Sequence, residues 1–396
     1  MRIAYICADP GVPVFGRKGS SVHVQEVIRA MLRTGADVTL FANRFDGDCP
    51  ADLAGVGVRQ LPRPPKGDPA AREKEALAAN DALRTALEEA GPFNLVYERY
   101  SLWSFAGMDV ARSAGIPGVL EVNAPLIKEQ AEHRDLVDRL AAEQVASRAF
   151  GAATVLAAVS EQVAAYLHTF PVTSGRVQVI PNGVNPLRFP AGLPPLVPAP
   201  CGTFTIGFIG TLKRWHGLPV LIDAFDRLYQ DNPQTRLLIV GDGTERQNIE
   251  TDLARRGLLH AVTLTGAVPP DTIAGYLASM DVGVAPYPDM PDFYFSPLKV
   301  FEYMAAGLPV VASDIGQIAE FIEHDVNGLL CPPGSPSALT LTLVRLRRDP
   351  EQRERLGKAG RLSVLRDHTW DGAVKRIYER AGLSPAAQPQ LAGIGN

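Results

Sequence analysis

The chain has 396 residues, of which 46% are hydrophobic and 21% are charged, and its formal net charge is −4. This composition supplies enough apolar side chains for packed cores and excludes wholesale disorder. The slight negative charge gives no reason to expect a nucleic-acid partner. The length exceeds what one ordinary core holds, so it predicts two domains.

The cysteines and the apolar runs indicate a cytoplasmic protein. No stretch of about 18 or more apolar residues could span a bilayer, and Asp9 and Pro10 interrupt the N-terminal strand too early for a signal peptide. The cysteines show no Cys-x-x-Cys spacing, which is typical of reduced thiols and argues against a zinc site or a disulfide framework. They are Cys7, Cys49, Cys201 and Cys331.

The first half of the chain alternates strands and helices in the order typical of a doubly wound sheet. Arg2–Ala8 is a predicted buried strand, and Asp9–Ser21 is a predicted glycine-rich loop that contains Gly19. Val22–Thr34 has helical spacing, and Asp37–Ala42 is a second strand. The loop lacks the Gly-x-Gly-x-x-Gly spacing and does not predict a dinucleotide site. Its glycines still allow backbone to approach a ligand closely.

The basic, proline-rich segment Leu61–Lys74 is predicted to be a loop. Contact with anionic lipid is one interpretation, which limits any membrane contact to a peripheral one. The acidic side chains of Asp68 and Glu73 favour the other interpretation, a solvated surface loop.

Two later strands of this half end in polar residues. Leu95–Arg99 ends in Arg99, and Gly118–Val122 carries Glu121 and precedes Asn123. Open α/β sheets bind ligands at the carboxyl ends of their strands, so these three side chains are candidate ligand contacts. Bonding to loop backbone explains them equally well.

The middle of the chain predicts the end of the first domain. The predicted elements are a charged helix Glu129–Phe150, a strand Thr154–Val159, a helix Ser160–His168 and a strand Val177–Ile180. The proline-crowded segment after residue 189 has no periodic pattern and is predicted to be a linker. The domains are therefore expected at residues 1–189 and 203–368, joined by 190–202.

The second half repeats strand–loop–helix units, which predicts a second parallel sheet. The predicted strands are Thr205–Ile209, Thr235–Val240, Val262–Thr265, Val282–Ala285 and Val310–Ala312. The predicted helices are Leu218–Tyr229, Thr272–Ser279, Leu339–Leu346, Glu351–Leu365 and a last helix over 369–383 that starts at Thr369-Trp370-Asp371. Residues 384–396 are expected to form a frayed tail.

A helix followed at once by a strand stands out in residues 296–320. Ser296 is a candidate N-cap, and Pro297 suits the first helical position, where no N–H is needed. The predicted helix Leu298–Ala306 ends at Gly307, a residue at home in a left-handed C-terminal position.

Glu302 lies beside the apolar face of this predicted helix, where a carboxylate is costly unless it receives hydrogen bonds. One interpretation is a surface pair with Lys299, which would be common and weak. The other is a carboxylate that grips ligand hydroxyls while the helix N-terminus faces a phosphate.

The run KVFEYMAAGLPVVASDIGQIAEFI, followed by NGLLCPPG, resembles the donor-nucleotide segment of the family 4 retaining glycosyltransferases, which have the GT-B fold. The resemblance covers most of the chain and is most specific in the C-terminal half. It implies two Rossmann-like doubly wound α/β domains facing across a cleft, with the helix 369–383 packing back on the first domain. It also implies a nucleoside-diphosphate-sugar donor and neither a metal nor another cofactor.

The resemblance also implies the donor contacts. In that family, a Glu at the position of Glu302 holds the ribose, and the turn of Ser296, Pro297 and Leu298 holds the diphosphate. The remaining implied donor contacts come from glycine-rich loops: Gly19, Gly210, Thr211, His216, Gly241, Gly243, Glu245 and Val268.

The chain departs from the family pattern in its cationic residues. Many members carry an Arg directly after the glycine of the first strand of this domain and a Lys five positions on, where this chain has Thr211 and His216. We expect Lys213 and Lys299, with the backbone N–H groups of Leu298 and Lys299, to stabilise the departing diphosphate instead. The alternative for Lys213 is a solvent-exposed loop lysine.

Two further departures affect the sugar and the acceptor. The first glutamate of the donor motif is absent: Tyr294 stands at its position, and Asp292 and Ser296 are the nearby substitutes. A family His near the reacting sugar is replaced by Asn123, which becomes a candidate catalytic residue. Arg99 and Glu121 are the candidate contacts to acceptor or sugar beside it.

The sequence therefore predicts a retaining hexosyltransferase that uses a hydroxyl acceptor in polysaccharide, glycoconjugate or secondary-metabolite biosynthesis. A nucleotide-sugar epimerase or hydrolase of the same fold and a non-catalytic partner subunit are the alternatives. The acceptor, the nucleotide and the oligomeric state stay open. An internal partner for Glu302 would overturn the transferase interpretation.

Overall fold

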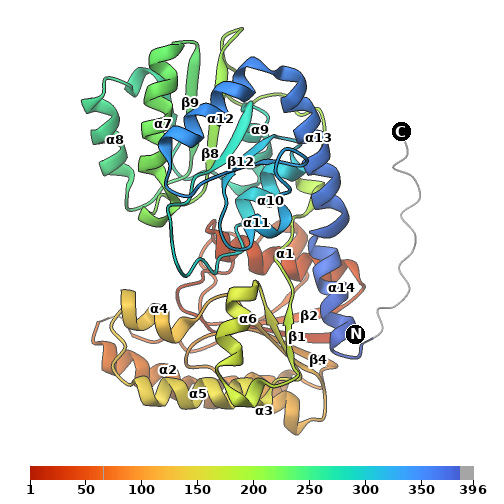
Figure 1. The fold of residues 1–396 in the computed structure, drawn as a ribbon. Helices are drawn as coiled ribbons and strands as arrows, with labels where there is room; N and C mark the ends of the chain where they lie inside the picture. Colours follow the sequence, from red (N-terminus) through yellow and green to blue (C-terminus); the bar gives the residue numbers. More distant parts are fainter. Residues whose placement is uncertain (66, 384–396) are drawn as a thin grey trace. The chain divides into compact units, whose positions relative to one another are not determined.

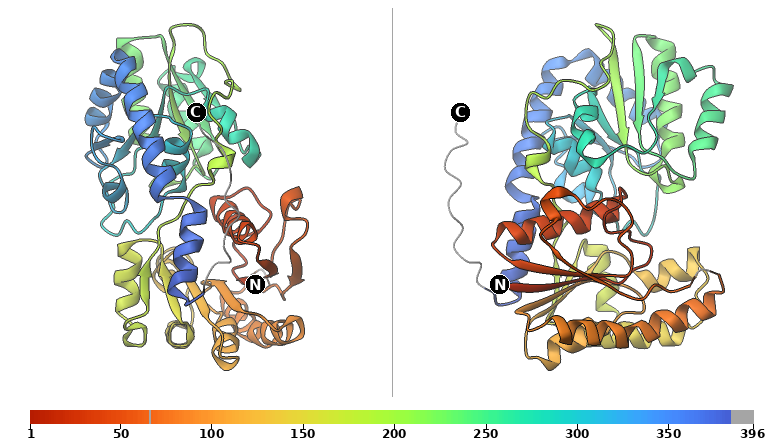
Figure 2. Two further views of the ribbon diagram at one scale, coloured as in Figure 1. Left: turned by 90° about the vertical axis from the view of Figure 1, so that its right-hand side faces the viewer. Right: turned by 180° about the vertical axis from the view of Figure 1, so that it is seen from behind.

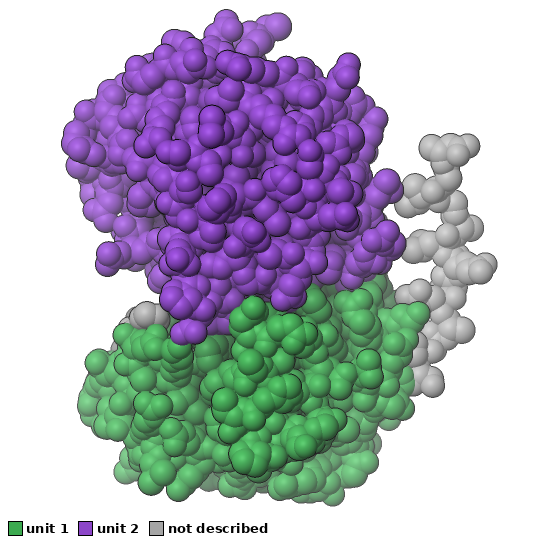
Figure 3. Space-filling view, viewed as in Figure 1, with its two compact units in different colours: residues 1–16, 20–181, 370–396 green, residues 17–19, 182–369 purple. Residues whose placement is uncertain are grey.

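The computed structural model describes residues 1–65 and 67–383, so the predicted tail 384–396 lies outside the described residues. The chain forms two compact units, coloured separately in Figure 3. Unit 1 contains residues 1–16, 20–181 and the segment that begins at Trp370, and unit 2 contains residues 17–19 and 182–369.

Unit 1 is built on a parallel sheet of seven strands in the order β3-β2-β1-β4-β5-β6-β7. β2, β4 and β5 occupy the residues that the apolar runs predicted. The strands are β1 (Arg2–Cys7), β2 (Asp37–Ala42), β3 (Gly57–Gln60), β4 (Leu95–Arg99), β5 (Gly118–Val122), β6 (Val155–Ala158) and β7 (Val177–Val179).

Helices cover both faces of this sheet, with α1 on one face and α2, α3 and α5 on the other (Figures 1 and 2). The helices of unit 1 are α1 (Gly19–Arg33), α2 (Pro69–Ala90), α3 (Ala106–Ser113), α4 (Leu126–His133), α5 (Arg139–Ala152), α6 (Glu161–His168) and α14 (Trp370–Arg380). Strands covered on both faces are mostly apolar, so most strands of unit 1 read as hydrophobic runs, whereas the exposed edge strand β3 does not.

Two predictions for unit 1 are wrong. The loop predicted over Leu61–Lys74 ends at Asp68, because α2 begins at the next residue, Pro69. The carboxylate of Asp68 caps this helix by accepting hydrogen bonds from the amides of Ala70 and Ala71. The single helix predicted over Glu129–Phe150 is two helices, because the chain is extended at Arg134 and Asp138 caps a new start.

Unit 2 is built on a parallel sheet of six strands in the order β10-β9-β8-β11-β12-β13. Its first strand in sequence, β8, lies in the middle of the sheet, as β1 does in unit 1. The strands are β8 (Phe204–Ile209), β9 (Thr235–Val240), β10 (Val262–Leu264), β11 (Val282–Ala285), β12 (Val310–Ser313) and β13 (Leu329–Cys331).

Helices also flank the sheet of unit 2 (Figure 1). They are α7 (Leu218–Asp231), α8 (Arg246–Arg255), α9 (Ile273–Leu277), α10 (Leu298–Ala305), α11 (Ile318–Phe321), α12 (Pro336–Arg348) and α13 (Pro350–Asp367). Both units therefore share the strand order of a Rossmann-like domain, which reverses between β1 and β4 and between β8 and β11.

The proline-rich segment 190–202, predicted as a linker, belongs to unit 2. The amide of Leu196 donates to the carbonyl of Gly275 at 3.0 Å, and the amide of Val197 donates to Ser279 Oγ at 3.0 Å. These bonds fix the segment against the α9 region. The segment has no periodic apolar pattern because it forms an irregular part of unit 2 and not a helix or a strand. The chain passes between the units near residues 181 and 369.

Within the described residues, no helix combines the length and the hydropathy that a bilayer crossing requires.

Candidate functional site

The carboxyl ends of β8, β9 and β10 carry loops that are bonded to one another. The amide of Gly210 donates to the carbonyl of Val240 at 3.0 Å, and the amide of Leu212 donates to that of Asp242 at 2.9 Å. A single bridge joins Gly241 to Gly266. These loops meet next to the β8/β11 reversal, where open α/β sheets bind their ligands.

Close packing explains why two of the predicted donor-binding glycines are glycines. A Cβ on Gly241 would lie 2.0 Å from the carbonyl oxygen of Gly210, and one on Gly243 would lie 2.3 Å from that of Leu212. Gly241 also has a φ of 140°, which L side chains rarely adopt. Both glycines therefore have a structural role, whatever ligand they approach.

The start of α10 differs from the prediction. Pro297 is the N-cap residue, one position later than the predicted Ser296, and no side chain caps the helix. Ser296 instead accepts from Asn182 with its Oγ (3.3 Å) and with its carbonyl oxygen (3.1 Å). The turn that follows β7 thus holds Ser296, while Leu298 and Lys299 form the first helical turn.

Lys299 is buried, with a relative exposure of 8%, and its Nζ has no hydrogen-bond partner among the described residues. The ammonium lies 4.1 Å from the centre of the Phe208 ring and 5.3 Å from that of Tyr287. It sits against Gly210, where an added Cβ would come within 3.2 Å of it. The surface pair with Glu302 considered from the sequence is therefore wrong, because Lys299 is not at the surface.

Burial gives this lysine and its neighbour His216 unusual protonation. Loss of hydration lowers the pKa of Lys299 to about 7, and the Glu302 carboxylate offsets this only in part. Burial and the charge of Lys299 lower the pKa of His216 to about 3. His216 is therefore neutral at pH 7, donates from Nδ1 to the carbonyl of Thr211 and supplies no positive charge.

Glu302 has an internal partner. Its Oε1 lies 3.2 Å from Nη1 of Arg188, and the two side chains are 16% and 18% exposed. Arg188 also donates from Nη2 to the carbonyl of Pro270 at 2.9 Å. This pair is the arrangement that would count against a ribose contact, so Glu302 alone cannot carry the functional assignment.

The other residues predicted for this site lie on the loops of unit 2 and make separate contacts. Lys213 is half-buried, with its Nζ 5.7 Å from the ring centre of Trp215. Glu245 precedes α8 and accepts from Asn248 at 3.0 Å. Val268 is half-buried against the core of unit 2.

The two positions suggested as sugar contacts precede α10. Asp292 is exposed and Tyr294 is half-buried, with its ring centre 4.5 Å from that of Phe295.

The polar strand ends of unit 1 converge on the carboxylate of Glu121. Its Oε1 lies 2.8 Å from His23 Nε2, and its Oε2 accepts from Asn123 Nδ2 at 3.1 Å and lies 3.8 Å from Arg99 Nη1. Burial opposes the charge on Glu121, but His23 and Arg99 outweigh it and lower its pKa to about 2. The ring of Trp370 covers His23, with the ring centres 4.8 Å apart.

This cluster brings Arg99, Glu121 and Asn123 together but occupies the carboxylate with internal partners. Glu121 is 5% exposed, whereas Asn123 is half-buried and lies at the edge of the cluster. Gly19, predicted from the same half, is the first residue of α1, and an added Cβ there meets no other atom within 4 Å.

Sequence reasoning missed His23 and Arg188. His23 lies in a helix whose apolar spacing carries no sign of a strand-end partner 98 residues away. Arg188 lies 114 residues from Glu302 in a proline-rich turn. Neither position has a local signal, because each pairing is created only by the tertiary fold.

Two family descriptions match the chain: "Glycosyl transferase 4-like domain" over residues 18–183 and "Glycosyl transferases group 1" over residues 203–349. A D-inositol 3-phosphate glycosyltransferase of Jonesia denitrificans is 27% identical, and the match covers 97% of each chain. An uncharacterized glycosyltransferase of Methanocaldococcus jannaschii is 29% identical over 232 residues, which are 56% of this chain and 57% of that protein.

Solved structures share the fold. Sucrose-phosphate synthase from Thermosynechococcus elongatus has a TM-score of 0.75 at 23% identity, covering 96% of this chain and 98% of the other. HepE from Anabaena, in complex with UDP and glucose, has a TM-score of 0.72 at 20% identity, covering 96% and 99%. The predicted GT-B fold class is thereby confirmed, and the chain is a GT-B glycosyltransferase of group 1 type.

Proposed function

We propose that the chain transfers a sugar from a nucleoside diphosphate-sugar to a hydroxyl acceptor with retention of configuration, and that unit 2 binds the donor. The observation that carries this proposal is the buried ammonium of Lys299, which has no hydrogen-bond partner among the described residues. A buried charge without a hydrogen-bond partner is costly, and a bound anion would supply the missing interaction.

The surroundings of Lys299 suit a diphosphate. Lys299 lies in the first turn of α10, where the backbone N–H groups lack helical partners and the helix dipole favours an anion. The positive φ of Gly210 (136°) and its missing side chain leave the backbone of the β8 loop open beside the ammonium. Lys299 thus supplies the charge that stabilises the departing diphosphate. HepE in complex with UDP and glucose makes a UDP-sugar the first donor to test.

Glu302 has a narrower role in this proposal. Its carboxylate is held by Arg188 and lies one turn along α10 from Lys299. A ribose hydroxyl would then donate to a carboxylate that is already oriented. The assignment of the chain to the glycosyltransferases does not depend on this contact, because it follows from the family matches.

The experiment is binding of UDP to the full chain by isothermal titration calorimetry, followed by incubation with UDP-glucose and methanol as a minimal acceptor. We expect saturable UDP binding and methyl α-glucoside as the product, because retention preserves the α configuration of the donor. Methyl β-glucoside would refute retention. A UDP-sugar epimer as the only product would favour an epimerase, and the absence of binding by UDP, GDP, ADP and TDP would favour a non-catalytic subunit.

A further inference from the structure

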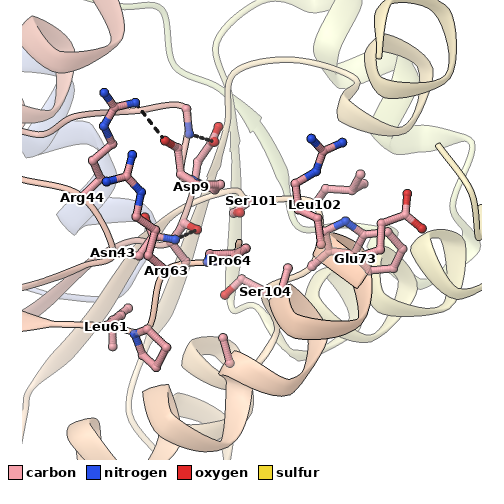
Figure 4. Close-up of a pocket in the computed structure, with 18 of the residues that line it drawn as sticks. Asp9, Asn43, Arg44, Leu61, Arg63, Pro64, Glu73, Ser101, Leu102 and Ser104 are labelled. Carbon is pink, nitrogen blue, oxygen red and sulfur yellow. Dashed lines mark hydrogen bonds between the residues drawn. The ribbon is translucent and has the colours of Figure 1, made fainter. Parts of the chain in front are cut away.

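Unit 1 contains a cavity of about 490 Å³ that the proposed donor site does not use. Ala8 and Asp9 after β1, Asn43 after β2 and Ser101 after β4 contribute to its lining (Figure 4). Because the strand order of unit 1 reverses between β1 and β4, the cavity lies at the switch point of this sheet. Its size is within the range of ordinary ligand pockets.

One part of the cavity wall is apolar. Leu61, Leu83 and Leu102 are buried and line it. Ala76 and Ala79 of α2 lie on the same helix face as Leu83 and extend this surface. Prolines of the loop after Leu61, together with Trp103, complete the wall. A fully polar ligand would leave this surface without a partner.

The lining contains four acidic residues, Asp9, Glu73, Glu129 and Asp135, and the carboxylates of Glu73 and Asp9 accept hydrogen bonds from backbone amides. Both oxygens of Glu73 accept amide hydrogens, from Val137 and Asp138, at 2.9 Å each. Oδ1 of Asp9 accepts the amide of Gly11 at 2.7 Å. These two acids therefore fix the loops that frame the cavity.

The arginines in the lining are different. Among the described residues, the guanidinium groups of Arg63, Arg72 and Arg134 have no hydrogen bond and no ion pair, although all three line the cavity. Asn43 is 5% exposed, and its Oδ1 is buried without a hydrogen-bond partner in the described part of the chain. Figure 4 shows Asn43, Arg44 and Arg63 on one side of the cavity, opposite Leu102 and Glu73.

We propose that this cavity binds the acceptor and that the acceptor combines an apolar body with an anionic group, a phosphate or a carboxylate. The inference rests on the proposed transferase function. The planar guanidinium fork matches both anions geometrically, and the leucine and proline wall desolvates the apolar body. The Asn43 oxygen is a hydrogen-bond acceptor that suits a hydroxyl of such a ligand.

The test uses n-octyl phosphate, below its micelle concentration, as a probe that carries both features. Inorganic phosphate and n-octyl β-glucoside carry one feature each. By calorimetry on the full chain, we expect n-octyl phosphate to bind at least tenfold more tightly than either. Equal binding of inorganic phosphate would overturn the role of the apolar wall, and equal binding of the octyl glucoside would overturn the role of the arginines.

Two pairs of variants locate the binding. Ala79→Phe fills the cavity from α2, whereas Ala78→Phe adds the same ring at the neighbouring exposed position. Arg72→Met removes a lining guanidinium, whereas Lys74→Met removes an exposed charge two residues on that does not line the cavity. The first member of each pair should weaken n-octyl phosphate binding at least tenfold, and the second should leave it unchanged. Equal effects within a pair would overturn the assignment to this cavity.

UDP binding, measured on the same variants, separates this inference from the proposed function. UDP should bind all four variants as it binds the unmodified chain. UDP binding without n-octyl phosphate binding would overturn only the acceptor class. Octyl phosphate binding without binding of any nucleotide would overturn the acceptor role itself, since the proposed reaction would then have no donor.

Discussion

Replacing Lys299 with methionine should stabilise the fold and weaken donor binding at the same time. The lowering of its pKa from 10.5 to about 7 means that burial disfavours the charged form by about 5 kcal/mol. Methionine keeps the apolar stem against Phe208 and Tyr287 but carries no charge. Because methionine also loses the contacts of the ammonium with the two rings, we expect a net gain below the full penalty, about 1–3 kcal/mol. For a unit of this size, that gain raises the unfolding midpoint by about 3–8 °C.

The same substitution removes the group that is proposed to meet the diphosphate. A hydrogen bond to a charged group contributes about 1.5–3 kcal/mol, so UDP affinity should fall by about 10- to 100-fold. Differential scanning calorimetry and titration calorimetry measure the two effects on one sample. The matched control is Lys358→Met, because Lys358 is 73% exposed and pairs only weakly with Glu354 on α13. A lower midpoint with unchanged UDP affinity would show that the ammonium is a structural group and would refute the reasoning.

The remaining predictions concern pH, Arg188 and Glu121. As pH rises above about 7, Lys299 in the free protein loses its proton, whereas binding of the diphosphate requires the protonated form. UDP affinity should therefore fall about tenfold per pH unit, and Lys299→Met should abolish this slope. A pH-independent UDP affinity in the unmodified chain would contradict this prediction. Arg188→Met should weaken UDP binding about tenfold, because Glu302 and the carbonyl of Pro270 lose their partner, and Arg188→Lys should restore part of the loss. If the double variant Arg188→Met with Glu302→Gln shows the sum of the two single losses, the pair does not act as a unit. Glu121→Gln should lower stability by about 2–4 kcal/mol by leaving the charge of Arg99 without its carboxylate. The pKa of Glu121 is lowered from 4.5 to about 2 in the folded protein, so its carboxylate contributes its full stabilisation above pH 4.5 and loses it as pH falls from 4.5 to about 2. Urea titrations at pH 6 and pH 3 that show the same cost of Glu121→Gln would contradict this prediction.

The strands could be predicted closely because each signal is local. Thr235–Val240 and Gly118–Val122 are apolar runs bounded by turn residues, and a strand buried on both faces needs nothing else to be recognised. Helix boundaries were less accurate where capping decides them. Asp68 and Asp138 start helices that the charge pattern alone did not predict at those positions.

The sequence by itself determined the α/β class, most of the strands and the helix that carries Lys299 and Glu302, because propensity and apolar periodicity act over a few residues. Only the tertiary structure decided that Lys299 is buried under Phe208 and Tyr287, that Glu302 pairs with Arg188, and that His23 meets Glu121. Each of these contacts joins residues from different elements. Burial and charge pairing, which set the protonation and the chemistry of a side chain, depend on which elements pack together and not on the residues beside it in the chain.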